Sequence, residues 1–176
     1  MQHTTGRLIL RGYTAEDKLN LFRLFNEKFV ASYMYHICAN TIYDVEGHID
    51  FIMKNAELQS RTHYFFIVEL EETREFLGII GYALAEETET GSVMELEYYL
   101  LEEHWGKGYM TEALAKILQV AFDDGRVAKV FGQCHVENAS SANVMIKCGM
   151  KKSIIQPSPK IYNGVLKENV RYEIMA

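Results

Sequence analysis

Residues 94–122 read MELEYYLLEEHWGKGYMTEALAKILQVAF, and this stretch decides how the rest of the chain can fold. Its first part, 94–101, is dense in aromatic and branched side chains, which predicts a strand. A glycine-bearing turn follows at 105–109. Apolar residues then recur at three- and four-residue spacing, which predicts a helix with this buried stripe: Met110, Leu114, Ile117, Leu118, Ala121 and Phe122.

A strand, a glycine turn and a helix N-terminus together make an anion site. The first turn of a helix has unpaired N–H groups and a partial positive charge, and glycines let a phosphate approach the backbone. Gly106-Lys107-Gly108 lacks the Gly-x4-Gly-Lys-Ser/Thr spacing of a P-loop and the third glycine of a dinucleotide fingerprint. The spacing alone therefore leaves a tight structural turn and a ligand site both open.

Length and composition predict one compact, soluble domain spanning residues 1–176. The chain has 48% hydrophobic residues and two prolines, and it is long enough for one substantial core. The net charge of −6, without an evident basic patch, argues against a nucleic-acid partner. An acidic average suits a cationic acceptor, and it also fits plain solubility.

Cysteine and histidine spacing predicts no metal site. Cys38, Cys134 and Cys148 are an odd number at wide spacing, which favours reduced thiols in a cytoplasmic protein. Histidines such as His63 and His104 show no ligand spacing. No apolar run reaches membrane-spanning length and no signal region opens the chain, so we expect a cytoplasmic protein without a membrane partner.

Hydrophobic periodicity predicts the remaining elements. A helix begins near Thr14, and another covers 44–60 with Ile49, Ile52, Met53 and Ala56 as its buried stripe. An aromatic-rich connection occupies 29–43, and 157–164 is expected to be a loop. The other predicted strands are 7–11, 63–70, 76–85, 128–136, 150–155 and 170–175, and a short helix is expected at 138–149.

Two patches carry a resemblance to a known family. Tyr98-Tyr99-Leu100 and residues 105–113, WGKGYMTEA, resemble the acetyl-CoA signature of the GCN5-related N-acetyltransferase (GNAT) superfamily, and most of all its RimJ/RimL-like branch. Members of that branch commonly read Tyr-Trp-Leu and then Trp-Gly-Lys/Arg-Gly-Tyr-Ala-Thr-Glu-Ala. Residues 138–150 resemble a second string of the branch, Asn-x-x-Ser-x-x-Val-x-x-Lys-x-Gly-Phe. Tyr99, Met110 and Met150 depart from these patterns without removing a backbone N–H.

The resemblance implies an α/β (α+β) fold of the GNAT type. We expect a three-layer arrangement, with a mixed twisted sheet of about six or seven strands and about four helices. It further implies that the strands at 93–101 and 129–136 splay apart to admit the pantetheine arm of the cofactor.

The same resemblance implies an N-acetyltransferase that moves an acetyl group directly from acetyl-CoA to a primary amine, either a protein N-terminus such as a ribosomal protein or a small molecule. Backbone N–H groups of residues 106–111 would hold the pyrophosphate, and one near Tyr99 or Leu100 would polarise the carbonyl. The region around Tyr33 and Tyr35 would line the acceptor pocket. The full set expected at the cofactor is Tyr98, Tyr99, Leu100, Trp105, Gly106, Lys107, Gly108, Tyr109, Met110, Thr111, Asn138 and Asn143.

Two carboxylates are candidates for the base that deprotonates the amine. Glu95 and Glu97 lie on one face of the predicted strand, roughly 7 Å apart along it, while Met94 and Leu96 lie on the opposite, apolar face. Glu95 matches an acidic position common in the family, so we expect it to be the base and Glu97 to be the second candidate. A solvated strand face is the alternative.

Ser141 is the expected acid for the leaving thiolate. Many GNAT enzymes use a tyrosine near this position, but residues 144–147 contain none, and a serine of the RimJ/RimL-like branch matches Ser141. A helix-capping hydroxyl is the alternative. Cys134 and His135 are neighbours that point to opposite faces of a strand, which disfavours a covalent cysteine.

Two points stay open on the sequence alone. A catalytically idle CoA-binding or regulatory module of the same fold is the rival to an enzyme, and it would keep the glycines but lack the base and the acid. A homodimer is compatible with the sequence.

Overall fold

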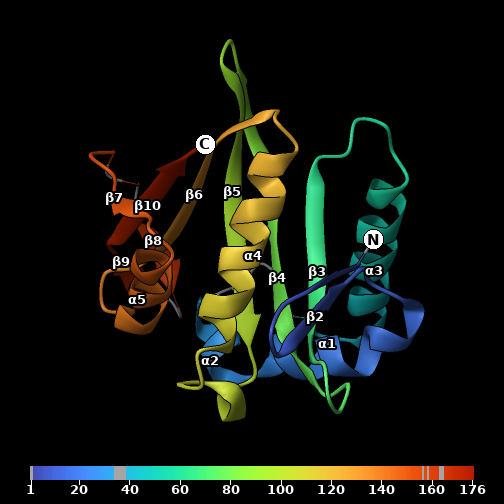
Figure 1. Ribbon diagram of the computed structural model, residues 1–176. Coiled ribbons are helices and arrows are strands. Elements are labelled where there is room, and N and C mark those ends of the chain that lie inside the picture. The colour runs from blue at the N-terminus through green and yellow to red at the C-terminus, as the bar shows by residue number, and fades with distance from the viewer. Residues whose placement is uncertain (1, 34–38, 156, 158, 163–164) are drawn as a thin grey trace.

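The computed structural model describes residues 2–33, 39–155, 157, 159–162 and 165–176. Within these ranges an eight-stranded sheet has the order β1-β2-β3-β4-β5-β6-β10-β7, and β8 pairs with β9 apart from it (Figure 1). The strands are β1 Gln2–Thr4, β2 Leu8–Arg11, β3 His63–Leu70, β4 Phe76–Thr88, β5 Gly91–Leu100, β6 Val127–His135, β7 Lys151–Lys152, β8 Lys160–Tyr162, β9 Val165–Lys167 and β10 Asn169–Met175. The helices are α1 Lys18–Asn26, α2 Lys28–Tyr33, α3 Ile42–Ala56, α4 Tyr109–Asp123 and α5 Ala139–Lys147, with 3-10 turns η1 Ala15–Asp17 and η2 Glu102–His104.

Helices cover both faces of the sheet, as the three-layer prediction requires. One core lies between the sheet and α4, where Leu96 of β5 packs with Ala113 and Leu114. A second core lies on the opposite face, where Phe25 of α1 and Ile49 of α3 are buried. We call these two sides of the sheet the α4 face and the α3 face. The predicted α/β class is confirmed, with β5 parallel to β6 and the other pairs of the main sheet antiparallel.

The side chains of strand β5 point alternately to the α4 face and the α3 face. Met94, Leu96 and Leu100 are buried in the core of the α4 face. Tyr99 packs against the core of the α3 face. The alternation that the sequence predicts for this strand is therefore confirmed, and side chains at odd positions of β5 point toward α1 and α3.

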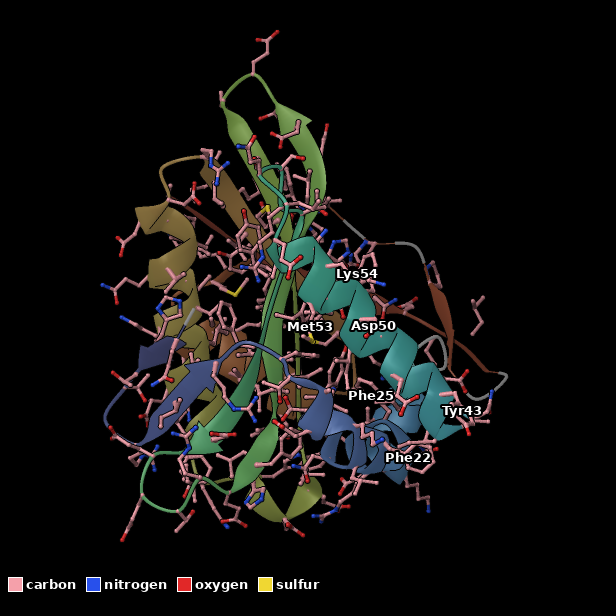
Figure 2. The ribbon with its side chains drawn as sticks, turned by 90° about the vertical axis from the view of Figure 1, so that its right-hand side faces the viewer. Phe22, Phe25, Tyr43, Asp50, Met53 and Lys54 are labelled. Atoms are coloured by element: carbon pink, nitrogen blue, oxygen red, sulfur yellow. The ribbon has the colours of Figure 1, made fainter. Side chains whose placement is uncertain are left out.

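Helix α3 begins earlier and ends earlier than predicted. Its N-terminus is closed by a capping box, in which Thr41 N donates to Asp44 Oδ2 at 2.8 Å. Ile49 and Ile52 are buried as expected, but Met53 is 39% exposed, and Figure 2 shows it on this helix with Asp50 and Lys54.

The buried stripe of α3 ends on a polar residue. Asn55 is buried and Ala56 is exposed, so the prediction for Met53 and Ala56 was wrong. Asn55 Oδ1 accepts hydrogen bonds from the N–H groups of Thr62 and His63, at 3.2 and 2.8 Å. These bonds join the end of α3 to the start of β3.

The C-terminal third differs most from the prediction. The expected strand at 150–155 is reduced to β7, and part of the expected loop at 157–164 forms β8, which pairs with β9 in the register Lys160↔Lys167. Helix α2 occupies part of the connection expected at 29–43. The short edge strand β1, which was not predicted, raises the strand count of the main sheet to eight in the described residues. Within the same ranges, no helix has both the length and the apolarity needed to cross a bilayer.

Candidate active site

Strands β5 and β6 are paired over only part of their length. Their parallel register runs from Ser92↔Val127 to Leu96↔Gly132, while β5 continues to Leu100 and β6 to His135. A Cβ atom on Gly132 would lie 2.7 Å from Met145 Sδ, so this glycine lets α5 pack closely where the pairing ends. The splay expected from the family resemblance is confirmed, and it opens at the C-terminal ends of both strands.

The glycine turn stands at the same end of the sheet (Figure 1). Gly106 and Gly108 have φ angles of +73° and +80°, in the left-handed region that favours glycine. Gly108 is the N-cap of α4, and the first N–H bond within the helix runs from Glu112 to Gly108 O at 3.1 Å. The N–H groups of Tyr109, Met110 and Thr111 precede that bond, so they have no acceptor within the helix, which is the arrangement that an anion site uses.

A cluster from the N-terminus holds this turn, and sequence analysis missed it. Arg7 Nη1 donates to Lys107 O at 3.2 Å, and its guanidinium lies 4.6 Å from the centre of the Tyr109 ring. Arg7 Nη2 also pairs with Glu112 Oε2 at 2.7 Å. Partial burial opposes ionisation of Glu112, but hydrogen bonds from Thr5 and Arg7 outweigh it and lower the pKa of this carboxyl. The side chain of Glu112 therefore stays charged and holds Arg7, which in turn donates to the glycine turn.

Trp105 ties the turn back to β5. Its indole Nε1 donates to Leu100 O at 3.0 Å, and its ring meets Phe29 edge-on at a centroid distance of 4.9 Å. Met110 is buried in the core of the α4 face. Lys107 is exposed. Of the predicted cofactor set, Trp105 and Met110 thus contribute packing through their side chains.

A pair of hydroxyls lies on the α4 face beside the parted strands. Tyr98 Oη donates to Ser141 O at 2.9 Å and lies 2.8 Å from Ser141 Oγ. The N-cap of α5 is Asn138, whose Oδ1 accepts from Ser141 N at 3.1 Å. The Ser141 hydroxyl is therefore not the cap of this helix. Burial raises the pKa of Tyr98 well above its usual range, so this phenol stays protonated at neutral pH.

Cys134 lies on the same face but is a poor nucleophile. It is buried in the core of the α4 face, and burial raises the pKa of its thiol. Its Sγ lies 3.9 Å from Asn138 O. A protonated, buried thiol agrees with the expectation that acyl transfer does not pass through this cysteine.

The two candidate bases are on the α3 face. Gln133 Nε2 of β6 donates to Glu95 Oε1 at 3.1 Å. Glu95 is opposite Phe131, within the paired part of the strands, and Glu97 is the first residue of β5 beyond it. No spacing rule could have found Gln133, because strand β6 is brought beside β5 only by the fold.

Tyr13 and His48 lie beside each other on the same α3 face. Burial, followed by the negative charges of Asp17 and Glu97, raises the pKa of Tyr13. The rings of Tyr13 and His48 are 5.8 Å apart, and burial with the nearby His63 lowers the pKa of His48 to about 4. His48 is therefore neutral at pH 7.

The remaining predicted residues are placed as follows. Asn143 is exposed on α5. Tyr33 is the last residue of α2, and Tyr35 lies outside the described residues. The structure thus brings together the glycine turn, the hydroxyl pair and the parted strands on the α4 face, with Glu95 and Glu97 across the sheet.

Comparisons with known proteins agree with this arrangement. A family model described as an acetyltransferase (GNAT) domain matches residues 7–151. The Uncharacterized N-acetyltransferase YoaA of Bacillus subtilis (strain 168) is 27% identical over 173 residues, which cover 97% of this chain and 94% of YoaA.

Two solved structures share the fold. Spermidine N-acetyltransferase from Vibrio cholerae, in complex with CoA and spermine, matches with a TM-score of 0.80 at 19% identity, covering 97% of this chain and 96% of that one. Ribosomal-protein-S5-alanine acetyltransferase from Vibrio fischeri matches with a TM-score of 0.82 at 16% identity, covering 99% and 96%. The acceptors named for these two proteins differ, so the shared fold does not identify the acceptor.

Proposed function

Because this chain belongs to the GNAT acetyltransferase family, we propose that it transfers an acetyl group from acetyl-CoA directly to a primary amine. A protein N-terminus, such as that of a ribosomal protein, and a small-molecule amine are the two acceptor classes. The proposal extends the family assignment to this chain's own cofactor, residues and acceptor.

The observation that carries the proposal is the parting of β5 from β6 beyond Leu96 and Gly132, beside the N-terminus of α4. Free N–H groups at the start of α4 suit a pyrophosphate. An extended thiol arm can hydrogen-bond to the strand edges that the partner strand leaves unpaired. The glycine turn and the parted strands lie at one end of the sheet, so one extended ligand can reach both.

Glu95 and Ser141 supply the proton transfers. Glu95 takes a proton from the ammonium, directly or through water, and the amine nitrogen then attacks the thioester carbon. A carbon–nitrogen bond forms and the carbon–sulfur bond breaks, with a backbone N–H near Tyr99 or Leu100 polarising the carbonyl. The Ser141 hydroxyl protonates the departing sulfur, and the second proton that the nitrogen loses as the amide forms restores this hydroxyl, so one proton remains on Glu95 and is released to solvent.

The sheet separates the two proton transfers. Ser141 and its partner Tyr98 are on the α4 face, whereas Glu95 and Glu97 are on the α3 face. The thiol then enters from the α4 face and the amine from the α3 face, and they meet between the parted strands. Two carboxylates on the α3 face favour an acceptor that arrives as a cation.

A catalytically idle CoA-binding module is the alternative. It requires the glycine turn and the parted strands but neither carboxylate nor hydroxyl. Gln133 positions the carboxylate of Glu95, and Tyr98 positions the hydroxyl of Ser141, although a CoA-binding module would need neither arrangement. These contacts favour the enzyme.

A thiol-release screen with acetyl-CoA tests the proposal. The panel contains peptides with free N-termini, polyamines, amino acids and aminoglycosides, and a reaction without amine measures hydrolysis. We expect thiol release that depends on one class of amine, with mass spectrometry showing one added acetyl group on that amine. CoA binding without amine-dependent thiol release across the panel would favour the idle module.

A further inference from the structure

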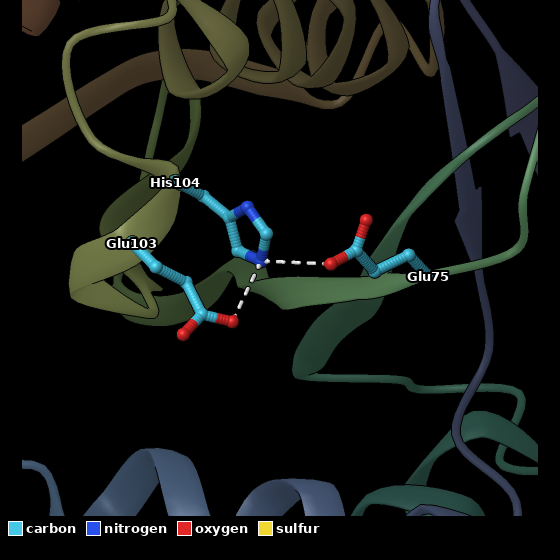
Figure 3. A group of neighbouring side chains, drawn as sticks. All are labelled: Glu75, Glu103 and His104. Carbon is cyan, nitrogen blue, oxygen red and sulfur yellow. Dashed lines mark ion pairs between the residues drawn. The ribbon is translucent and has the colours of Figure 1, made fainter.

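A histidine and two glutamates from distant parts of the chain meet at the η2 turn, which precedes the glycine turn in the chain. His104 and Glu103 belong to the η2 turn, and Glu75 directly precedes β4 (Figure 3). One ligand atom from each residue lies within 4.8 Å of the other two. Spacing along the sequence hides this group, because Glu75 is far from His104 in the chain.

The imidazole of His104 is aimed between the two carboxylates. His104 is 5% exposed, and its Nε2 is buried with no hydrogen-bond partner among the described residues. The distances from this Nε2 to Glu103 Oε1 and Glu75 Oε1 are 3.5 and 3.7 Å. Both exceed normal hydrogen-bond lengths. A buried ring nitrogen without a partner is costly, so this arrangement calls for a ligand.

The spacing fits a shared metal ion. Zinc binds histidine nitrogen and carboxylate oxygen at about 2.0–2.2 Å in tetrahedral geometry, which places neighbouring ligand atoms about 3.4 Å apart. The two observed distances are within a few tenths of an ångström of that value. Three protein ligands with an open fourth position also match the open type of zinc site.

Backbone and side-chain contacts hold the ligands in place. Glu103 Oε2 accepts from Arg23 Nη2 at 2.7 Å, which leaves Oε1 directed at His104. His104 N donates to Leu101 O at 3.0 Å, and Leu70 N donates to Glu75 O at 3.0 Å. The side chains of Glu75 and Glu103 are about half exposed, so an ion can reach the site from solvent.

We propose that Glu75, Glu103 and His104 bind one Zn²⁺ ion, which joins the turn before β4 to the η2 turn. Two carboxylates and a neutral imidazole give the site a charge of −2, which suits a divalent cation. His104 directly precedes Trp105, so the ion would brace the approach to the glycine turn. The rival arrangement is a protonated His104 that pairs with the two carboxylates and needs no metal.

Zinc titration of the full-length chain tests this proposal. The protein is treated with EDTA, the EDTA is dialysed away, and ZnCl2 binding is measured by calorimetry. We expect one ion per chain and a rise in Tm of about 7 °C when free zinc is about 100 times Kd.

Matched variants locate the ion. Glu75→Gln and Glu103→Gln should each raise the Kd for Zn²⁺ by at least about 10-fold, since each removes a ligand. Glu72→Gln, at an exposed acid in the same turn as Glu75, should leave the Kd unchanged. These substitutions are at exposed side chains, so the variants should fold. Absence of zinc binding, or equal binding by all three variants, would overturn the proposal and leave the imidazolium pair.

Discussion

The two faces of the sheet are built differently around the point where β5 and β6 part. On the α4 face, contacts between near neighbours in the chain, such as Trp105 to Leu100 and Ser141 to Asn138, hold the glycine turn and the start of α5, and Arg7 and Tyr98 add contacts from distant segments. On the α3 face, Gln133 reaches Glu95 across 38 positions, and Tyr13 comes from the N-terminal segment. A site that binds through the backbone therefore leaves a sequence pattern, whereas a site assembled from distant side chains leaves almost none.

The largest expected effect is at the glycine turn. Gly108→Asp puts a carboxylate where we place the pyrophosphate, and like charges about 4 Å apart cost about 4 kcal/mol near a protein surface, close to 1,000-fold in affinity. The added Cβ would lie 3.6 Å from Arg7 Nη2, an ordinary contact, and Asp is among the residues that tolerate the left-handed φ of +80°, at a cost of about 1 kcal/mol, so the variant should fold. Calorimetry with CoA measures the change in Kd.

Gly47→Asp is the matched control for this charge. Gly47 is exposed in α3 with nothing within 4 Å of an added Cβ. The Gly47→Asp protein should bind CoA with the same Kd as the unmodified protein. Unchanged CoA affinity in a folded Gly108→Asp protein would place the pyrophosphate elsewhere and remove the main difference between the two faces.

The next effect is at the base on the α3 face. Glu95→Gln keeps the shape of the side chain and the contact with Gln133 but cannot take a proton, so kcat should fall by about 100-fold. The acidic limb of the pH profile should flatten as well. Glu97→Gln, two residues along the same face, is the matched variant and should lose far less. A larger loss in Glu97→Gln would make the residue beyond the paired strands the base.

The same contrast explains what sequence could predict. The strand, turn and helix of 94–122 were predicted because their periodicity reflects packing against one sheet face. Met53 and Ala56 were misplaced because Asn55, a polar residue, ends the buried stripe of α3 through bonds to β3. Arg7 and Gln133 were missed because each contacts a segment that only the fold brings near, the glycine turn for Arg7 and strand β5 for Gln133.

The α3 face should also respond to pH in its stability. Burial and His63 lower the pKa of His48 to about 4, below the ordinary value of 6.5, so the unfolded chain binds a proton that the native chain does not. Stability contributed by the neutral ring is fully present above pH 6.5 and falls toward pH 4. The loss from pH 8 to pH 5 should be about 2 kcal/mol. Denaturant unfolding of His48→Gln should show a flatter dependence, and an equally steep one would contradict this.

The smallest expected effect is at Ser141 on the α4 face, where comparison with Asn138 distinguishes a catalytic role from a helix-capping role. Thiolates leave readily, since thiols have a pKa of about 8.5, so losing the acid in Ser141→Ala should lower kcat only about 10-fold with little change in KM for acetyl-CoA. Asn138→Ala removes the cap of α5 and should cost about 1 kcal/mol of stability while kcat is retained. Measuring kcat, KM and unfolding free energy on both variants compares two residues three positions apart. If Ser141→Ala lost stability and kept its kcat, its hydroxyl would only support the helix with Tyr98, and the sulfur would take its proton from another group.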